Sequence, residues 1–139
     1  MYSIVAGGGK VGSNVTRTLI ALGHEITLIE QRPDRFARLE EEFGPTVIRG
    51  DATEIAVLER AGIPDADAAV VATDGDNTNL VIGQVLQKRY GIGTVVVRVL
   101  DPKRAKLYAD RGMSIVCPTQ TAISELLATV ESATPKASA

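Results

Sequence analysis

Six short apolar runs, spaced along almost the whole chain, limit the folds that this sequence can adopt. They are residues 2–6, 25–30, 45–50, 68–73, 94–99 and 113–118. Several of them, such as "AAVVAT" at 68–73, are continuously apolar rather than alternating. Continuous apolar runs are typical of parallel strands that are covered on both faces of a sheet. We therefore predict six strands in a parallel sheet.

The segments between these runs carry the signals of helices. Apolar residues recur with helical spacing, for example at Val11, Val15 and Leu19. Asp101-Pro102 and the capping-box spacing of 51–54 predict two helix starts. Glycines that can stop a helix stand at Gly23, Gly44, Gly62, Gly91 and Gly112. The alternation predicts a doubly wound, Rossmann-like α/β fold with six parallel strands in the order 3-2-1-4-5-6.

The end of the chain differs from the rest. At 139 residues the chain fits one domain, which we expect to cover residues 1–118. A helix is predicted over 119–131 and a flexible tail over 132–139. The helix has one apolar stripe, which packs either on its own sheet or against another subunit; its residues are Ile123, Leu126, Leu127 and Val130.

The composition is that of a soluble globular protein without a strong field of either sign. Hydrophobic residues make up 45% of the chain, and 15 basic side chains stand against 17 acidic ones. This balance argues against a nucleic-acid partner. Since no apolar run approaches the roughly 20 residues that span a bilayer, and no signal-peptide pattern opens the chain, we expect a cytoplasmic protein without membrane insertion.

A glycine loop follows the first predicted strand and opens the first predicted helix. Gly7-x-Gly9-x-x-Gly12 has the spacing of a dinucleotide-binding fingerprint in the expected context. Gly7 would make the tight turn, Gly9 would let a pyrophosphate approach the backbone, and Gly12 would let helix and strand pack closely. Free N–H groups at the helix start would face the phosphates. The whole loop comprises Gly7, Gly8, Gly9, Lys10, Val11 and Gly12.

The second half of this fingerprint is an acid at the end of the second strand. Glu30 stands there, followed by Gln31. Its carboxylate could accept hydrogen bonds from both ribose hydroxyls and would repel a 2′-phosphate, which favours NAD(H) or an adenine nucleotide over NADP. Arg32 and Arg35 weaken that argument, because a basic side chain can accommodate the extra phosphate. A tight βα turn without any ligand stays as the alternative interpretation.

Two other loop motifs do not fit. A P-loop needs GxxxxGK[ST], but Ile4 stands at the place of the first glycine and Val11 follows the lysine. The stretch 74–78 begins like a calcium loop, yet Asn79 replaces the turn glycine and Val85 the bidentate glutamate. We expect the acids of this stretch to cap the helix that follows.

Groups for chemistry on a bound nucleotide are missing from the pattern. The single histidine, His24, falls at the amino end of the predicted sheet, whereas ligands bind at the carboxyl ends. The single cysteine, Cys117, lies in an apolar run, where a buried side chain is expected rather than a nucleophile. No Tyr-x-x-x-Lys pair and no metal-ligand cluster occurs in the sequence. We therefore predict a nucleotide-binding protein that is not an enzyme.

The order of these features resembles one family over nearly the whole chain. The matching pieces are "GGGKVG", "LIEQRPDRFARLEEEFG", "VIRGDATEIAVLERAGI", "ADAAVVATDGDNTNLVIGQV" and "VVVRVLDPKRAKLYADRGMSIVCP". The chain is similar to the N-terminal nucleotide-binding half of RCK domains, also called KTN or TrkA-N domains. The run from "GDAT" to "ADAAVVAT" discriminates, because ordinary dehydrogenases share the glycine loop and not this sequel.

The resemblance assigns roles to particular residues. It implies that the glycine loop cradles phosphates, that Lys10 reaches a phosphate, in some relatives across a dimer, and that Glu30 holds the ribose. The segment of Asp51, Ala52 and Thr53 is expected against adenine, with Asp51 also open to a capping role. Arg98 would supply positive charge to the phosphates or pair with a surface acid. The remaining binding residues implied are Gln31, Arg32, Ala72, Thr73, Asp74 and Asn77.

The resemblance also implies a function. Domains of this family regulate potassium channels and transporters through NAD(H) or ATP, ADP or AMP, and assemble as homodimers and often as octameric rings, with the final helix crossing between subunits. We expect the same here: a cytoplasmic regulatory subunit, peripheral at the inner face of the membrane through a potassium channel or transporter subunit.

Two alternatives to this function stay open at this point. One is the NAD-binding half of an oxidoreductase whose catalytic domain is elsewhere, and another is a domain that has lost its ligand. Full RCK proteins continue into a smaller C-terminal lobe, so the chain is either a piece of a longer protein or a stand-alone subunit.

Overall fold

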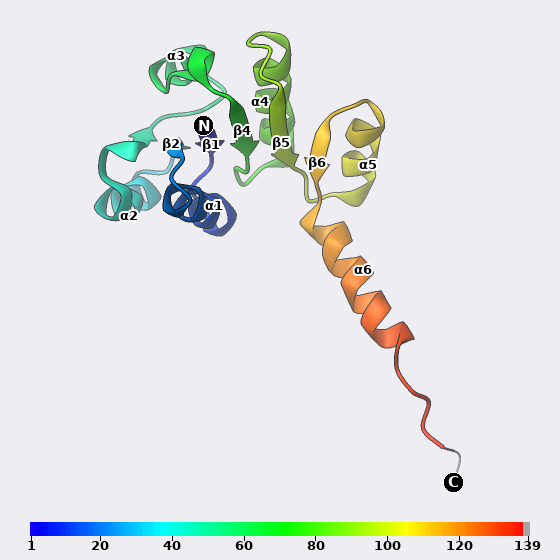
Figure 1. Ribbon diagram of the computed structural model, residues 1–139. Coiled ribbons are helices and arrows are strands. Elements are labelled where there is room, and N and C mark those ends of the chain that lie inside the picture. Colours follow the sequence, from blue (N-terminus) through cyan, green and yellow to red (C-terminus); the bar gives the residue numbers. More distant parts are fainter. Residues whose placement is uncertain (138–139) are drawn as a thin grey trace.

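The computed structural model describes residues 1–137, so the last two residues of the predicted tail lie outside the described residues. All six strands join one parallel sheet in the order β3-β2-β1-β4-β5-β6 (Figure 1). The predicted strand order and parallel direction are therefore confirmed. The strands are β1 (Tyr2–Ala6), β2 (Glu25–Glu30), β3 (Val47–Arg49), β4 (Ala68–Val71), β5 (Thr94–Arg98) and β6 (Ser114–Val116).

Within residues 1–137, six α-helices and two short 3₁₀ turns connect and follow the strands. The helices are α1 (Lys10–Ala21), α2 (Pro33–Phe43), α3 (Ile55–Arg60), α4 (Asp76–Lys88), α5 (Pro102–Asp110) and α6 (Pro118–Glu131). The 3₁₀ turns are η1 (Gly44–Thr46) and η2 (Ile63–Asp65). All five glycines that were expected to stop helices have positive φ angles, which confirms that part of the pattern.

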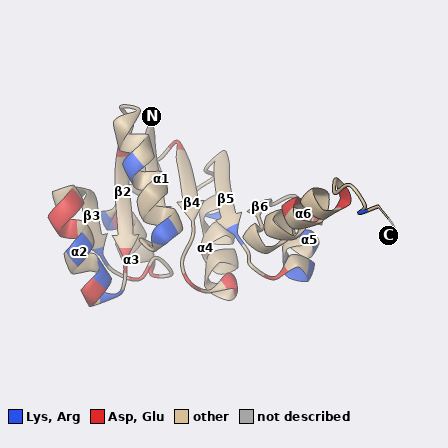
Figure 2. Ribbon diagram, turned by 90° about the horizontal axis from the view of Figure 1, so that it is seen from below, with Lys and Arg blue, Asp and Glu red and all other residues tan. Residues whose placement is uncertain are grey.

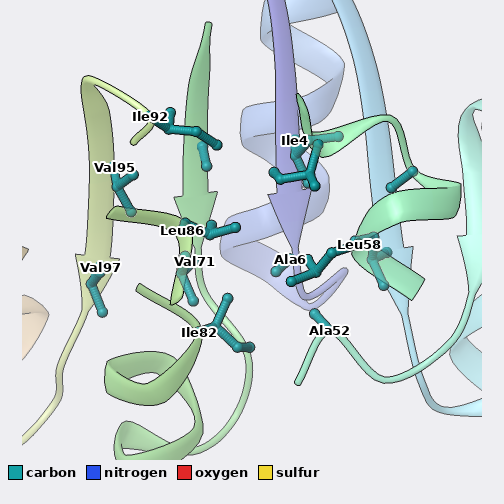
Figure 3. Packing of buried hydrophobic residues seen from close by; sticks show 14 of the residues in the cluster. Ile4, Ala6, Ala52, Leu58, Val71, Ile82, Leu86, Ile92, Val95 and Val97 are labelled. Carbon is teal, nitrogen blue, oxygen red and sulfur yellow. The ribbon is translucent and has the colours of Figure 1, made fainter. Parts of the chain in front are cut away.

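Two apolar clusters, one on each face of the sheet, make the core. In the larger cluster, Leu58 of α3 and Ile82 and Leu86 of α4 pack with inward side chains of β1, β4 and β5 such as Ile4 (Figure 3). The smaller cluster joins Leu28 of β2 to side chains of α1 and α2. Each fully buried aliphatic side chain contributes about 1.5–3 kcal/mol of stability.

The face of the sheet that carries α1 and α2 is covered unevenly. Helix α1 contacts β1 and β2, and α2 contacts β2 and β3. Beside α1 the same face opens into an apolar hollow on β4, β5 and β6, lined among others by Val70, Val96 and Val116. Val11 at the start of α1, 42% exposed, borders this hollow. An apolar strip of sheet thus reaches the surface on this side.

Helix α6 begins directly after β6 and projects away from the sheet (Figure 1). Residues 119–131 are all exposed, and the exposed fraction is 68% for Leu126 and 71% for Val130. The alternative in which the stripe packs on its own sheet is therefore wrong, and its use against another subunit stays a prediction.

Two of the expected helix caps are absent and one is present. Asp101 caps α5, because its Oδ2 accepts a hydrogen bond from Arg104 N at 3.0 Å. The prediction of a capping box at 51–54 is wrong. The residue before α3 is Glu54, whose side chain makes no capping hydrogen bond. Asp51 instead forms a local turn, in which its Oδ1 accepts a hydrogen bond from Thr53 N at 2.9 Å. The acids of 74–78 do not cap α4 either, since the N-cap is Gly75.

Charges of both signs are interspersed on the surface, for example along α2 (Figure 2). Within residues 1–137, no helix combines the length and the apolar character that a membrane crossing requires.

Candidate functional site

The glycine loop joins β1 to α1 at the carboxyl edge of the sheet. Gly7 has φ +101°, and a Cβ atom there would lie 2.4 Å from Ala72 O on β4's carboxyl side. A Cβ atom on Gly12 would lie 1.7 Å from Gly7 O. No side chain can replace either hydrogen without moving the backbone, so Gly7 makes the turn and Gly12 allows the close helix–strand contact, as expected. Gly9 has room, since its nearest neighbour would be Arg35 Nη1 at 3.7 Å.

Glu30, the last residue of β2, ties the glycine loop to the second strand. Its Oε1 accepts a hydrogen bond from Gly8 N at 2.9 Å, and its Oε2 accepts one from Arg32 N at 2.9 Å. The residue is only 4% exposed. A buried carboxylate needs such partners, because leaving its charge unpaired would cost several kcal/mol.

Arg35 completes the set of partners around Glu30. From α2 its Nη1 reaches Glu30 Oε1 at 3.2 Å and Asp74 Oδ2 at 3.3 Å, and its side chain is 18% exposed. Burial of the guanidinium opposes its charged form, but the hydrogen bonds and negative charges of Glu30 and Asp74 outweigh burial and raise the pKa of Arg35 above its ordinary value. Arg35 is therefore an ionic bridge between the ends of β2 and β4.

The carboxyl end of β4 is fixed by a buried amide. Asn79 of α4 is 1% exposed; its Oδ1 accepts from Thr73 N at 2.9 Å, and its Nδ2 donates to Arg98 O at 2.9 Å. The Arg98 guanidinium donates to Thr73 O at 2.6 Å. The loop after β4 is thus held from two sides.

A crevice of about 200 Å³ lies between these strand ends, where the strand order reverses at β1 and β4. Ligands of open α/β sheets bind at such a switch point. Its lining residues are Gly7, Ile29, Glu30, Gln31, Arg32, Arg35, Gly50, Asp51, Ala52, Thr73, Asp74, Gly75 and Thr78. A second hollow of about 450 Å³ lies between α1 and α2 and shares Arg35 with the crevice.

The structure brings most of the sequence-predicted site residues to these two hollows. The crevice contains Gly7, Glu30, Gln31, Arg32, Asp51, Ala52, Thr73 and Asp74. The α1–α2 hollow is lined by Gly8, Gly9 and Lys10, together with Arg17 and Arg38. The other predicted residues lie elsewhere: Val11, Ala72 and Arg98 border the apolar hollow on the sheet, Gly12 packs on Gly7, Thr53 bonds Asp51, and Asn77 is exposed in the first turn of α4.

The sequence reasoning missed Arg35 and Thr78, which line the crevice, and Asn79 beside it. Arg35 was considered only as a partner for a 2′-phosphate, because its contacts with Glu30 and Asp74 come from two other segments of the chain. Asn77 was chosen where Asn79 makes the contacts with Thr73 and Arg98. The apolar residues Ile82 and Leu86, three and seven positions after Asn79, were the available signal, since they mark the inward face of α4.

The arrangement suits binding of an anionic ligand. Backbone N–H groups at the start of α1 and the charge of Lys10 attract anions. His24 stands at the opposite, amino edge of the sheet, directly before β2. Within residues 1–137 no cluster of three or more His, Cys, Asp or Glu side chains could hold a metal ion.

Comparisons with known proteins agree with this architecture. The family model of the TrkA-N domain matches residues 3–118. The chain is 35% identical over 127 residues to a Trk system potassium uptake protein TrkA homolog of Methanothermobacter thermautotrophicus, covering 91% of this chain and 58% of the relative. It is 31% identical over 127 residues to the Trk system potassium uptake protein TrkA of Streptomyces coelicolor, covering 91% and 57%. The chain thus spans little more than half the length of these relatives.

A solved structure is also similar to this chain over nearly its whole length. The Kef C-terminal domain of Shewanella denitrificans in an AMP-bound form superposes with a TM-score of 0.79 and 28% identity, covering 96% of this chain and 84% of that one. The matched range of the family model contains the glycine loop and reaches beyond β6, and the chain belongs to the TrkA-N domain family.

Proposed function

We propose that this chain is a nucleotide-sensing regulatory module of a potassium-transport system. The observation that carries the proposal is the crevice itself, in which a glycine loop, a buried carboxylate and a half-buried guanidinium meet at the switch point of the sheet. The names of the two relatives, both potassium uptake proteins, support the transport assignment. The AMP-bound state of the Kef domain supports the ligand class.

The ligand is proposed to be AMP, ADP, ATP or NAD(H), bound through the parts that these molecules share. Adenine lies against Asp51 and Ala52, the ribose hydroxyls donate to Glu30, and the phosphate next to the ribose meets the N–H groups at the start of α1 and Lys10. A 2′-phosphate would have to approach a carboxylate that is already buried, so NADPH is expected to bind weakest.

Calorimetric titration of the chain with AMP, ADP, ATP, NAD, NADH and NADPH tests this assignment. We expect at least one adenine nucleotide to bind with one site per chain and NADPH to be the weakest. Preferential binding of NADPH would refute the role of Glu30, and no heat with any of the six would refute nucleotide sensing altogether.

The module is proposed to act without catalysis. A ligand regulates only if it binds one arrangement of the protein better than another. A regulatory role therefore predicts binding without turnover. Absorbance at 340 nm should stay constant when the chain is mixed with NADH and candidate carbonyl substrates, and sustained oxidation of NADH would support the oxidoreductase alternative instead.

The arrangement that the ligand biases is proposed to be that of two subunits joined through α6. Its exposed apolar stripe and the apolar hollow beside α1 are surfaces that a second copy would cover. The partner that senses the change is a potassium channel or transporter subunit, which would keep the module at the inner face of the membrane.

Sedimentation of two α6 variants tests the dimer. Leu126→Glu places a charge on the stripe and should shift the chain toward monomer, whereas the matched control Ala128→Glu adds the same charge on the opposite side of the helix and should leave the dimer intact. If both variants sediment like the unmodified chain, α6 is not the contact.

A further inference from the structure

We propose that Arg35 is the residue by which the crevice distinguishes phosphorylated from unphosphorylated nucleosides. In the structure it bridges Glu30 and Asp74 across the crevice, and it gives up this bridge only when a phosphate replaces the carboxylates. The inference rests on the proposed nucleotide site and concerns what that site selects.

The first argument is the space that Arg35 occupies. Its side chain lines both the crevice of about 200 Å³ and the α1–α2 hollow of about 450 Å³. Pockets for small molecules usually measure about 300–1,000 Å³. The crevice alone is below that range, and Arg35 stands between it and the larger hollow, so movement of Arg35 makes room for a nucleotide.

The second argument is the number of hydrogen bonds that Glu30 can accept. An ionised carboxylate has about four acceptor positions. Oε1 already accepts from Gly8 N and Arg35 Nη1, and Oε2 accepts from Arg32 N. One position is left, but a ribose diol offers two O–H donors. Departure of Arg35 restores the second position, on Oε1, so the diol and Arg35 compete for Glu30.

The third argument is the unequal burial of the two carboxylates. The side chain of Glu30 is 5% exposed, whereas that of Asp74 is 64% exposed. Asp74 can return to water after Arg35 leaves, and the ribose hydroxyls take over at Glu30. The guanidinium itself, 18% exposed, needs a new anion because an unpaired buried charge is costly.

The glycine loop puts that anion within reach. A Cβ atom on Gly9 would lie 3.7 Å from Arg35 Nη1 and 3.9 Å from Asp74 Oδ1, so the open side of Gly9 faces the ionic bridge. A phosphate at the start of α1 therefore lies beside the guanidinium and can pair with two of its N–H groups. A nucleoside without phosphate displaces Arg35 from Glu30 but supplies no anion to pair with the guanidinium.

The test compares the dissociation constants of adenosine and AMP by calorimetry. In the unmodified chain AMP should bind more tightly, by about 10- to 100-fold, as expected for a charge-assisted pair. In Arg35→Ala, adenosine should bind as well as in the unmodified chain or better, and AMP should bind more weakly. The ratio of the dissociation constant of adenosine to that of AMP should therefore fall by about 10-fold or more. Arg89→Ala, which removes an exposed arginine at the end of α4 that lines neither hollow, is the matched control and should leave the ratio unchanged.

Arg35→Gln provides a second variant if Arg35→Ala does not fold, because its amide keeps a neutral donor for Glu30. The ratio should fall in this variant as well. An unchanged ratio in either folded variant, or equal binding of adenosine and AMP by the unmodified chain, overturns the role of Arg35 while the nucleotide site stands. If the unmodified chain binds no adenine nucleotide, the proposed function and this inference both fail.

Discussion

Replacing Glu30 with glutamine should destabilise the protein even when no nucleotide is present. Glutamine has nearly the same shape, but only one of its two terminal groups accepts hydrogen bonds. In the protein, Gly8 N and Arg32 N each donate to a different oxygen of Glu30, at 2.9 Å. The amide NH₂ would therefore face one of these backbone N–H groups, donor against donor.

The size of the loss follows from the burial of the site. An unsatisfied buried N–H costs about 1–3 kcal/mol. The lost charge opposite the half-buried Arg35 adds about 1 kcal/mol, so the free energy of unfolding should fall by about 2–4 kcal/mol. For a chain of this length, 1 kcal/mol corresponds to roughly 3–5 °C, which predicts a decrease in Tm of about 6–20 °C.

Urea denaturation followed by circular dichroism measures this difference. Glu40→Gln is the matched control, since Glu40 is exposed on α2, and its stability should stay within about 0.5 kcal/mol of the unmodified chain. If Glu30→Gln is as stable as this control, the carboxylate does not hold the glycine loop to β2, and the account of the site is wrong.

Two further substitutions test the contacts that hold the glycine loop and the carboxyl end of β4 in place. Gly12→Ala should lower the free energy of unfolding by about 3 kcal/mol or more, because the added methyl group would overlap Gly7 O. The control Gly93→Ala should be tolerated, since a Cβ atom there meets nothing within 4 Å. Equal thermal stability of the two variants would contradict the packing argument. Asn79→Ala should cost about 2–4 kcal/mol through lost buried hydrogen bonds, whereas the exposed Asn77→Ala should be nearly neutral in the same urea titration. A neutral Asn79→Ala would show that the amide does not fix the end of β4.

The strands and their order could be predicted because they depend on local sequence patterns. Continuous apolar runs are needed wherever a parallel sheet is covered on both faces, and the turn at Gly7 needs a residue that tolerates a positive φ angle. Right-handed crossovers then leave few possible orders for the strands. The glycine loop and Glu30 belong to this predictable part, since their spacing is fixed by one strand, one turn and one helix.

The caps were less predictable, because a cap depends on the residue at which the helix begins. Asp51 has the right spacing, but α3 begins at Ile55, one turn later than the capping box requires, so Asp51 bonds Thr53 instead. Asp76 lies inside the first turn of α4, and its carboxylate accepts from Leu100 N at 2.8 Å in the loop after β5. A shift of a few residues in a helix start changes the partner of an acid.

The polar contacts of the site depend on tertiary packing and were missed for that reason. Arg35 has a long side chain whose direction is set by Glu30 and Asp74, residues that come from two other segments. The choice between Asn77 and Asn79 depends on which face of α4 turns toward the sheet, and two residues along a helix are about 200° apart. The apolar pattern of α4 indicates its inward face, but only the folded chain shows that Asn79 meets Thr73 and Arg98.

The central claim, that a nucleotide occupies the crevice between the glycine loop and Glu30, is tested most directly by an NMR titration of the ¹⁵N-labelled chain with AMP. At 14.7 kDa the chain suits this measurement. We predict that the amide signals of Gly8, Gly9, Arg32 and Thr73 shift as AMP is added, whereas that of His24 at the amino edge of the sheet stays in place. Unchanged signals at the glycine loop in saturating AMP, or shifts confined to the amino edge, would contradict the account.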